Sequence, residues 1–99
     1  MALRIRVSAR AEAQIRKLDE WWGVHRLAAP DAVLHDVHAA LSLLAQQPGI
    51  GTLYVSVRVQ GVRRLYLSRL GHFVYYRATD ETLDVLAIWH ASRERQPLL

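Results

Sequence analysis

Five arginines suited to binding an anion fall in a stretch of the chain that contains no acidic residue. Residues 37–79 include no aspartate and no glutamate. The arginines of this stretch are Arg58, Arg63, Arg64, Arg69 and Arg77. A guanidinium group is planar and permanently charged, and it can donate two parallel hydrogen bonds to a phosphate or a carboxylate. The stretch therefore predicts a surface that binds phosphate, a nucleic-acid backbone or an acidic protein segment.

The composition of the whole chain agrees with an acidic partner and excludes several classes of protein. The net charge is +4 and the isoelectric point is about 10.1. The chain has 99 residues, which predicts one domain spanning residues 1–99. The absence of cysteine excludes disulfides and thiolate metal sites. No apolar run reaches transmembrane length and no signal-peptide pattern is present. We expect a cytoplasmic protein with no membrane contact and no cofactor.

The first half of the chain predicts a short strand followed by two helices. Residues 3–7 alternate apolar and basic, which is typical of a strand at a sheet edge. Ser8 is a suitable N-cap for a helix from Ala9. Pro30 and Asp31 suit the start of a second helix. The apolar stripes of the two helices are Ala11, Ile15, Leu18 and Trp22, and Leu34, Val37, Leu41 and Leu44. The helices should form an antiparallel hairpin.

The second half predicts four strands. Residues 53–59 alternate strictly between apolar and polar side chains and form the clearest strand pattern in the sequence. Three further strands are expected at residues 63–68, 72–77 and 83–90, each bounded by turn residues. The predicted fold is α+β, with an N-terminal short strand and an antiparallel helical hairpin packed on one face of a mainly antiparallel sheet that ends in a four-strand C-terminal meander.

The alternation also predicts which residues face each other across the sheet. The expected pairs are Val57 with Leu65, Leu67 with Val74, Val74 with Ala87, and Tyr76 with Val85. The core face would then consist of Val55, Val57, Leu65, Leu67, Val74, Tyr76, Val85 and Ala87. On the opposite face, one row would contain Arg58, Arg64, Arg77 and Asp84, flanked by Tyr66 and Tyr75. Such a row would bind an anion, unless the arginines extend into solvent or stack on the tyrosines.

Two further groups of residues suggest contacts. An apolar patch is expected on the same outward face, to be covered either by the chain after Arg93 or by a partner. Its members are Phe73, Tyr75, Leu86 and Ile88. Trp21 is adjacent to the core residue Trp22, so it should face outward, where it would anchor a partner or pack on a neighbouring loop. Another group, Asp31, His35 and His38, lies on one helical face, but three candidate ligands beside a helix start do not predict a metal site.

Several short motifs together resemble the RelE/ParE superfamily of bacterial toxins. They are Gly61-Val62-Arg63-Arg64-Leu65, Tyr75-Tyr76-Arg77, and Val85-Leu86-Ala87-Ile88-Trp89-His90 followed by Arg93. The helical hairpin with Trp21-Trp22 and Ala29-Pro30 is also similar to the family, so the resemblance covers nearly the whole chain. The sequence His90-Ala91-Ser92-Arg93 resembles the ParE branch more closely than the RelE branch.

The resemblance implies a small α+β toxin that is held inactive by an antitoxin, whose C-terminal segment wraps around it in a hetero-oligomer. Toxins similar to ParE poison DNA gyrase, whereas toxins similar to RelE cut messenger RNA on the ribosome. The RelE branch typically carries a functional tyrosine, or a histidine and a tyrosine, near its C-terminus, and here no tyrosine follows Tyr76. Gyrase poisoning is therefore the leading expectation. A ribosome-dependent endoribonuclease and a non-toxic binding member remain alternatives.

RNA cleavage through the 2′-hydroxyl needs a base, an acid and a group that stabilises the charge on phosphorus. Arg64 and Arg77 suit the last role, and His90 is the only acid or base expected on the same face. These three residues are the catalytic candidates, and they form an incomplete set. The residues expected to bind the target or an anion are Arg58, Arg63, Arg64, Tyr66, Tyr75, Arg77 and Arg93. Those expected to bind the antitoxin are Trp21, Phe73, Leu86 and Ile88.

Overall fold

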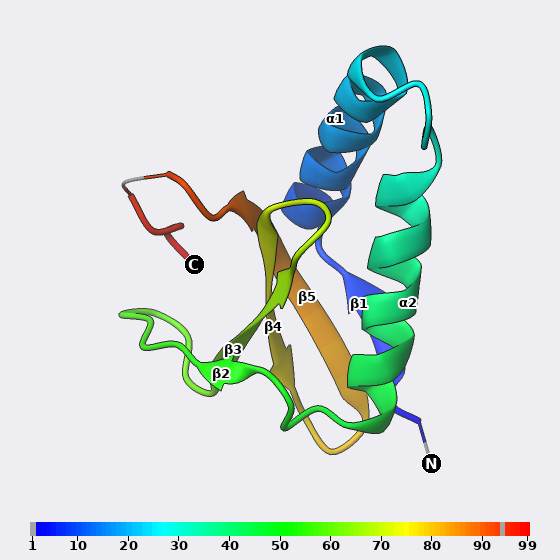
Figure 1. Ribbon diagram of the computed structural model, residues 1–99. Coiled ribbons are helices and arrows are strands. Elements are labelled where there is room, and N and C mark those ends of the chain that lie inside the picture. Colours follow the sequence, from blue (N-terminus) through cyan, green and yellow to red (C-terminus); the bar gives the residue numbers. More distant parts are fainter. Residues whose placement is uncertain (1, 94) are drawn as a thin grey trace.

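Two helices cover one face of a five-stranded sheet in the computed structural model, which describes residues 2–93 and 95–99 (Figure 1). The elements in chain order are β1 (Arg4–Val7), α1 (Ala9–His25), α2 (Ala32–Gln46), β2 (Thr52–Leu53), β3 (Val62–Leu67), β4 (His72–Ala78) and β5 (Thr82–His90). The strand order is β1-β5-β4-β3-β2. Strand β1 runs parallel to β5 and the other neighbours are antiparallel. The predicted α+β fold is confirmed. Among the described residues, no helix is long and apolar enough to cross a lipid bilayer.

The helix starts differ in how well the sequence predicted them. The Ser8 hydroxyl accepts a hydrogen bond from the Ala11 backbone N–H at 3.0 Å, so the predicted cap of α1 is confirmed. Asp31 holds the N-cap position of α2, but its side chain makes no capping hydrogen bond. The apolar stripe of α2 begins at Val33, because Leu34 is half exposed. The inward face of α2 is thus rotated by one residue at its start.

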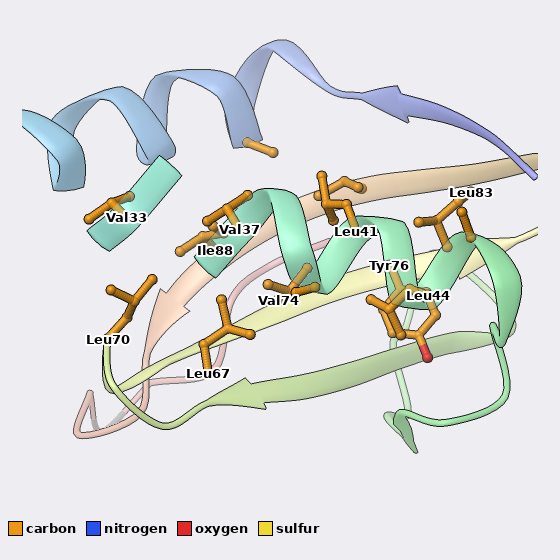
Figure 2. Packing of buried hydrophobic residues seen from close by; sticks show 14 of the residues in the cluster. Val33, Val37, Leu41, Leu44, Leu67, Leu70, Val74, Tyr76, Leu83 and Ile88 are labelled. Carbon is orange, nitrogen blue, oxygen red and sulfur yellow. The ribbon is translucent and has the colours of Figure 1, made fainter. Parts of the chain in front are cut away.

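The core lies between α2 and the middle of the sheet (Figure 2). Val33, Val37, Leu41 and Leu44 project from α2 towards Leu67, Leu70, Val74, Leu83 and Ile88. Each fully buried side chain of this size contributes about 1.5–3 kcal/mol relative to an exposed one. This contact fixes the helical layer on the sheet, and with it the position of α1 beside the end of β5.

Tyr76 connects the sheet to the chain that follows α2. Its ring is fully buried, its hydroxyl donates to the Pro48 carbonyl at 2.6 Å, and it accepts from the Gly51 N–H at 2.9 Å. Burial raises the pKa of Tyr76, which keeps the hydroxyl protonated and able to donate. A Cβ at Gly51 would lie 2.8 Å from the tyrosine ring, so this approach requires glycine.

The predicted strand over residues 53–59 is wrong beyond its start. Strand β2 ends at Leu53, and the Tyr54 N–H donates the last ladder bond, to the Val62 carbonyl at 2.8 Å. Thr52 lies opposite Arg64, so β3 has no residues left to pair with the chain beyond Tyr54. Val55 and Val57, which were expected in the core, are therefore exposed.

Two other registers differ from the prediction. In the β3–β4 hairpin, Leu65 rather than Leu67 lies opposite Val74, because the turn takes up residues 68–71 instead of two residues. This shift of two residues leaves the faces unchanged. Between β4 and β5, the pair Tyr76 with Val85 is confirmed, but an irregularity follows between Tyr75 and Tyr76.

Beyond that irregularity, Tyr75 lies opposite Ala87 and Val74 lies opposite Ile88. An extra residue in one strand turns every later side chain to the other face of the sheet. Ile88 therefore belongs to the core beneath the helices, and Ala87 packs with Tyr75 on the far face, the reverse of the prediction.

Candidate functional site

The predicted row of arginines does not form. Arg58 lies exposed in the loop between β2 and β3. Arg64 faces Thr52 on one side and Tyr75 on the other, whereas Arg77 faces Val62. The row failed because the strand that would have carried Arg58 ends at Leu53 and because the β3–β4 register is shifted by two residues. The five arginines of the acid-free stretch are instead distributed over several separate environments.

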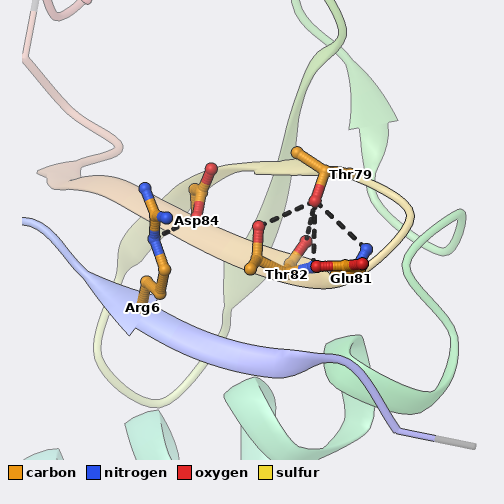
Figure 3. Close-up of polar contacts among 5 residues, drawn as sticks. All are labelled: Arg6, Thr79, Glu81, Thr82 and Asp84. Atoms are coloured by element: carbon orange, nitrogen blue, oxygen red, sulfur yellow. Dashed lines mark hydrogen bonds and ion pairs between the residues drawn. The ribbon is translucent and has the colours of Figure 1, made fainter.

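Arg77 lies near the C-terminal end of the central strand β4, in a region where carboxylates balance the arginines. It is opposite Asp84, and Asp84 Oδ1 forms an ion pair with Arg6 Nε at 3.0 Å (Figure 3). The neighbouring β4–β5 turn is closed by the Thr79 hydroxyl, which accepts from the Thr82 N–H at 2.9 Å. The residues lining the hollow here are Arg4, Arg6, Arg77, Thr79, Asp80, Glu81, Thr82 and Asp84. Equal numbers of acidic and basic groups make this a poor anion site.

Arg63 also has internal partners. Its guanidinium donates to the Gly51 carbonyl at 2.7 Å and, less closely, to the Gly49 carbonyl at 3.4 Å. These bonds hold the chain that leads from α2 into β2 against the sheet. Arg63 therefore acts as a structural arginine in this structure.

Arg64 lies on the far face of the sheet, in a cage of aromatic rings. Its guanidinium carbon is 4.1 Å from the centre of the Phe73 ring and 5.6 Å from that of Tyr54. Its Nη1 donates to the Tyr75 hydroxyl at 3.2 Å and to Gln96 Oε1 at 3.3 Å. The sequence left open that the arginines stack on tyrosines; Arg64 does stack on aromatic rings, but the nearest ring is that of Phe73.

The C-terminal residues close this cage, and we call residues 95–99 the tail. The Tyr75 hydroxyl donates to Gln96 Oε1 at 3.0 Å, and the Trp89 indole N–H donates to the Arg95 carbonyl at 2.7 Å. Pro97 is buried, and Leu99 packs against the far-face cluster of Val62, Tyr75 and Ala87. The tail therefore covers the predicted apolar patch. Phe73 and Leu86 remain partly buried at its margin, whereas Ile88 lies in the core.

A basic groove opens at the C-terminal end of β5, between α1 and the turn that joins β3 to β4. It consists of two adjoining hollows of about 630 Å³ and 260 Å³ that share Leu18, His72, His90 and Arg93. Its cations are Lys17, Arg26, Arg69 and Arg93. None of the described residues that line it carries a carboxylate. Arg69 donates two hydrogen bonds, of 2.6 Å and 2.9 Å, to the Asp36 carboxylate, which partly neutralises its charge. This contact lowers the pKa of Asp36.

Two histidines face each other in the groove because β4 begins where β5 ends. His72 and His90 are opposed across the ladder, and their ring centres are 4.8 Å apart in an edge-to-face arrangement. His72 Nδ1 is 2.7 Å from the Leu70 carbonyl and must donate to it. His90 Nδ1 accepts from the Ser92 N–H at 3.1 Å. His72 is therefore left with an accepting Nε2, and His90 with a donating Nε2–H.

The electrostatics of this pair favour a neutral His72. Burial lowers the pKa of His72, opposed by the hydrogen bond to the Leu70 carbonyl, while the charges of His90 and Arg93 lower it further. At neutral pH, His72 is thus an uncharged imidazole among cations. The arrangement can accept a proton at one ring and donate one from the other, and it can hold an anion through Arg93.

Tryptophans form the helical wall of the groove. Trp21 is 43% exposed, is stacked on His25 at 4.5 Å, and has the Arg26 guanidinium carbon 5.1 Å from its ring centre. Trp22 is buried, and its indole N–H has no hydrogen-bond partner among the described residues. Aromatic area, cations and an unsatisfied donor together suit an acidic, partly apolar segment of a protein.

The groove gathers four of the predicted site residues, Trp21, Ile88, His90 and Arg93. It excludes Arg58, Arg63, Arg64 and Arg77, which lie elsewhere. Tyr66 is half exposed on the far face, and its ring centre lies 5.2 Å from that of Phe73. Sequence reasoning missed Lys17, Arg26 and His72. The pairing of His72 with His90 could have been found only from the correct β4–β5 register.

Comparisons with known proteins agree with this fold. Residues 5–95 match the family described as the ParE toxin of the type II toxin-antitoxin system parDE. A solved structure of a chromosomal ParDE system from P. aeruginosa is similar at a TM-score of 0.72 and 21% identity, covering 92% of this chain and 98% of that one. The RelBE2 toxin-antitoxin complex from Mycobacterium tuberculosis is similar at a TM-score of 0.63 and 19% identity, covering 91% and 99%. No functionally curated protein matches the sequence significantly.

Proposed function

The chain belongs to the ParE toxin family of type II toxin-antitoxin systems, and from this premise we propose that it arrests growth by binding its target, DNA gyrase, through the basic groove. The cognate antitoxin neutralises it by placing an acidic segment in the same groove. Both partners would meet Trp21, Arg26 and Arg93. The resulting complex would be a toxin-antitoxin hetero-oligomer in which the antitoxin segment fills the groove.

The separation of the catalytic candidates carries this proposal. Arg64 is enclosed beneath the tail, Arg77 is beside Asp84 at one end of β4, and His90 is in the groove at the other end. A reaction centre needs its acid, its base and its charge-stabilising group within hydrogen-bond reach of one substrate. Three such separated residues cannot serve one phosphate. Action by binding is therefore supported over action through the predicted catalytic set.

A second candidate function rests on the histidine pair. His72 with an accepting Nε2 and His90 with a donating Nε2–H form an acid and base in the groove, and Arg93 and Lys17 could stabilise a phosphate. This set differs from the one predicted from sequence. It would suit a ribosome-dependent endoribonuclease.

One induction experiment separates the two functions. The wild-type chain, Arg93→Glu and His72→Asn are induced in a bacterial host, and a DNA-damage reporter and messenger RNA cleavage are scored in the same cultures. Binding to gyrase predicts damage with intact messages for the wild type and for His72→Asn, and neither effect for Arg93→Glu. Cleaved messages with intact DNA, lost in His72→Asn, would establish the ribonuclease instead. Growth unaffected by the wild-type chain would refute both.

A further inference from the structure

The chain that follows β2 has an unpaired edge up to the bend at Val57 and Arg58. Residues 53–57 alternate between exposed and partly buried side chains. Leu53 is exposed, Val55 is 94% exposed and Val57 is fully exposed, while Tyr54 and Ser56 lie against the molecule. Figure 1 shows this segment projecting from the sheet on the side away from α1 and α2. We call it the edge segment.

The backbone of the edge segment has a defined direction. Tyr54 bonds to Val62 and Thr52 lies opposite Arg64, so the even-numbered residues direct their backbone groups towards β3. The odd-numbered residues then direct theirs away from the sheet. No described residue hydrogen-bonds to the backbone of Val55 or Val57. An edge with apolar side chains and open backbone groups is a template for another strand.

We propose that the edge segment pairs with the same segment of a second copy of this chain, antiparallel and across a two-fold axis at Val55. In this register, Leu53 faces Val57 of the second copy, Val55 faces Val55, and Tyr54 faces Ser56. The three aliphatic residues each meet an aliphatic residue, and the paired odd-numbered positions are those whose backbone groups point outward. The two sheets become one continuous sheet.

A second copy fits this segment better than an acidic strand does. Residues 53–57 carry no charge, so nothing within them selects acidic residues in a partner. The segment is instead complementary to itself, which is the property a two-fold interface requires. Each copy carries a net charge of +4, and this repulsion weakens the dimer at low salt. Paired strands of this length bury less than the roughly 1,200 Å² of stable complexes, so we expect a micromolar dissociation constant.

Charge substitutions at the two-fold axis provide the test. The purified chain, made by cell-free synthesis, is examined by sedimentation velocity from about 5 to 200 µM, a range that brackets a micromolar constant. The wild type should shift from monomer to dimer, more strongly at higher salt. Val55→Lys and Val55→Glu should both remain monomeric, because each places like charges opposite one another. Val55→Thr, which keeps the β-branched shape, should still dimerise.

Cross-linking tests the register. The chain has no cysteine, so Val55→Cys introduces a single thiol. Opposed Cα atoms in a hydrogen-bonded antiparallel pair are about 5.5 Å apart, within disulfide range. Mild oxidation should convert most of this variant to a covalent dimer and little of the control Val24→Cys, which is also exposed. A wild type monomeric at every concentration and salt would overturn the proposal, as would equal cross-linking of both thiols. Opposite shifts of the lysine and glutamate variants would indicate a charged partner instead.

Discussion

The far face of the sheet and the basic groove both contain an arginine beside aromatic rings. The arginine on the far face is enclosed by its own chain, whereas the one in the groove is exposed. On the far face, Arg64 has aromatic rings around it and two hydrogen-bond acceptors from its own chain. In the groove, Arg93 lies over the Trp89 ring at 4.3 Å and is exposed, and the lining residues offer it no carboxylate. An arginine among aromatic residues therefore does not by itself indicate a binding site. What distinguishes the two regions is whether the chain satisfies the cation internally.

The largest expected effect is on growth inhibition. Arg93→Glu should raise the toxin level needed for growth arrest about 100-fold, because losing a buried interfacial charge pair costs about 2–5 kcal/mol. The melting temperature should change little, since the side chain is exposed. Arg4→Glu, an exposed arginine on β1 with the same change in net charge, is the matched control and should remain toxic. Equal loss in both variants would mean that net charge, not the groove, matters.

The next largest effect is on the stability of the fold, through the aromatic cage around Arg64 on the far face. Arg64→Ala should lower the free energy of unfolding by about 2 kcal/mol through lost cation–π contact, packing and hydrogen bonds. Arg64→Met, which preserves most of the apolar contact, should lose about half as much. Denaturant unfolding measures both variants, and folded Arg64→Met should still arrest growth. A stably folded Arg64→Met without toxicity would return this arginine to the functional site.

A smaller effect should follow from the tail. Gln96→Ala removes the acceptor shared by Arg64 and Tyr75 and should cost about 1 kcal/mol. Gln96→Glu places a carboxylate against the same guanidinium and should stabilise the fold by up to about 1 kcal/mol. Thermal unfolding of the pair compares them directly. If both substitutions were neutral, the tail would not close the cage in solution.

The smallest effect concerns His72 and pH. Because burial lowers its pKa, the unfolded chain binds more protons than the folded chain between that lowered value and about pH 6.5. Stability should therefore fall as the pH drops from 7.5 to 5.5. His72→Asn should flatten this dependence, whereas His38→Asn, on the exposed surface of α2, should not. Chemical denaturation at the two pH values measures the slopes, and equal slopes in both variants would contradict the assignment.

The sequence predicted the elements well because helices and strands follow from local periodicity. Ser8 capping α1 and the inward-facing apolar positions of β3 and β4 are examples. Apart from the start of α2, the failures concern the pairing of strands. Strict alternation predicted a strand at residues 53–59, although no neighbouring strand remained to pair with it. The irregularity at Tyr75 and the longer turn after Leu67 were not encoded in any local pattern. The row of arginines failed because Arg58 lies outside β2 and because the longer turn shifted Arg64 away from Arg77.

Prediction of the functional site succeeded for residues close in sequence and failed for contacts between distant elements. Residues close in sequence, such as His90 and Arg93, were recognised together. Their partners from other elements, Lys17, Arg26 and His72, were not, because only the packing of α1 beside the end of β5 brings them near. The position of the tail was not predicted, because its sequence has no periodicity. That position nevertheless decides which arginines are accessible.

The most direct test of the groove is a cleavage-complex assay with purified DNA gyrase. The wild type, Arg64→Met and Arg93→Glu are incubated with gyrase, ATP and plasmid, and protein-linked broken DNA is quantified. We expect the wild type and Arg64→Met to accumulate broken DNA and Arg93→Glu to leave it at background. Activity in Arg93→Glu together with its loss in folded Arg64→Met would place the functional surface on the far face of the sheet instead.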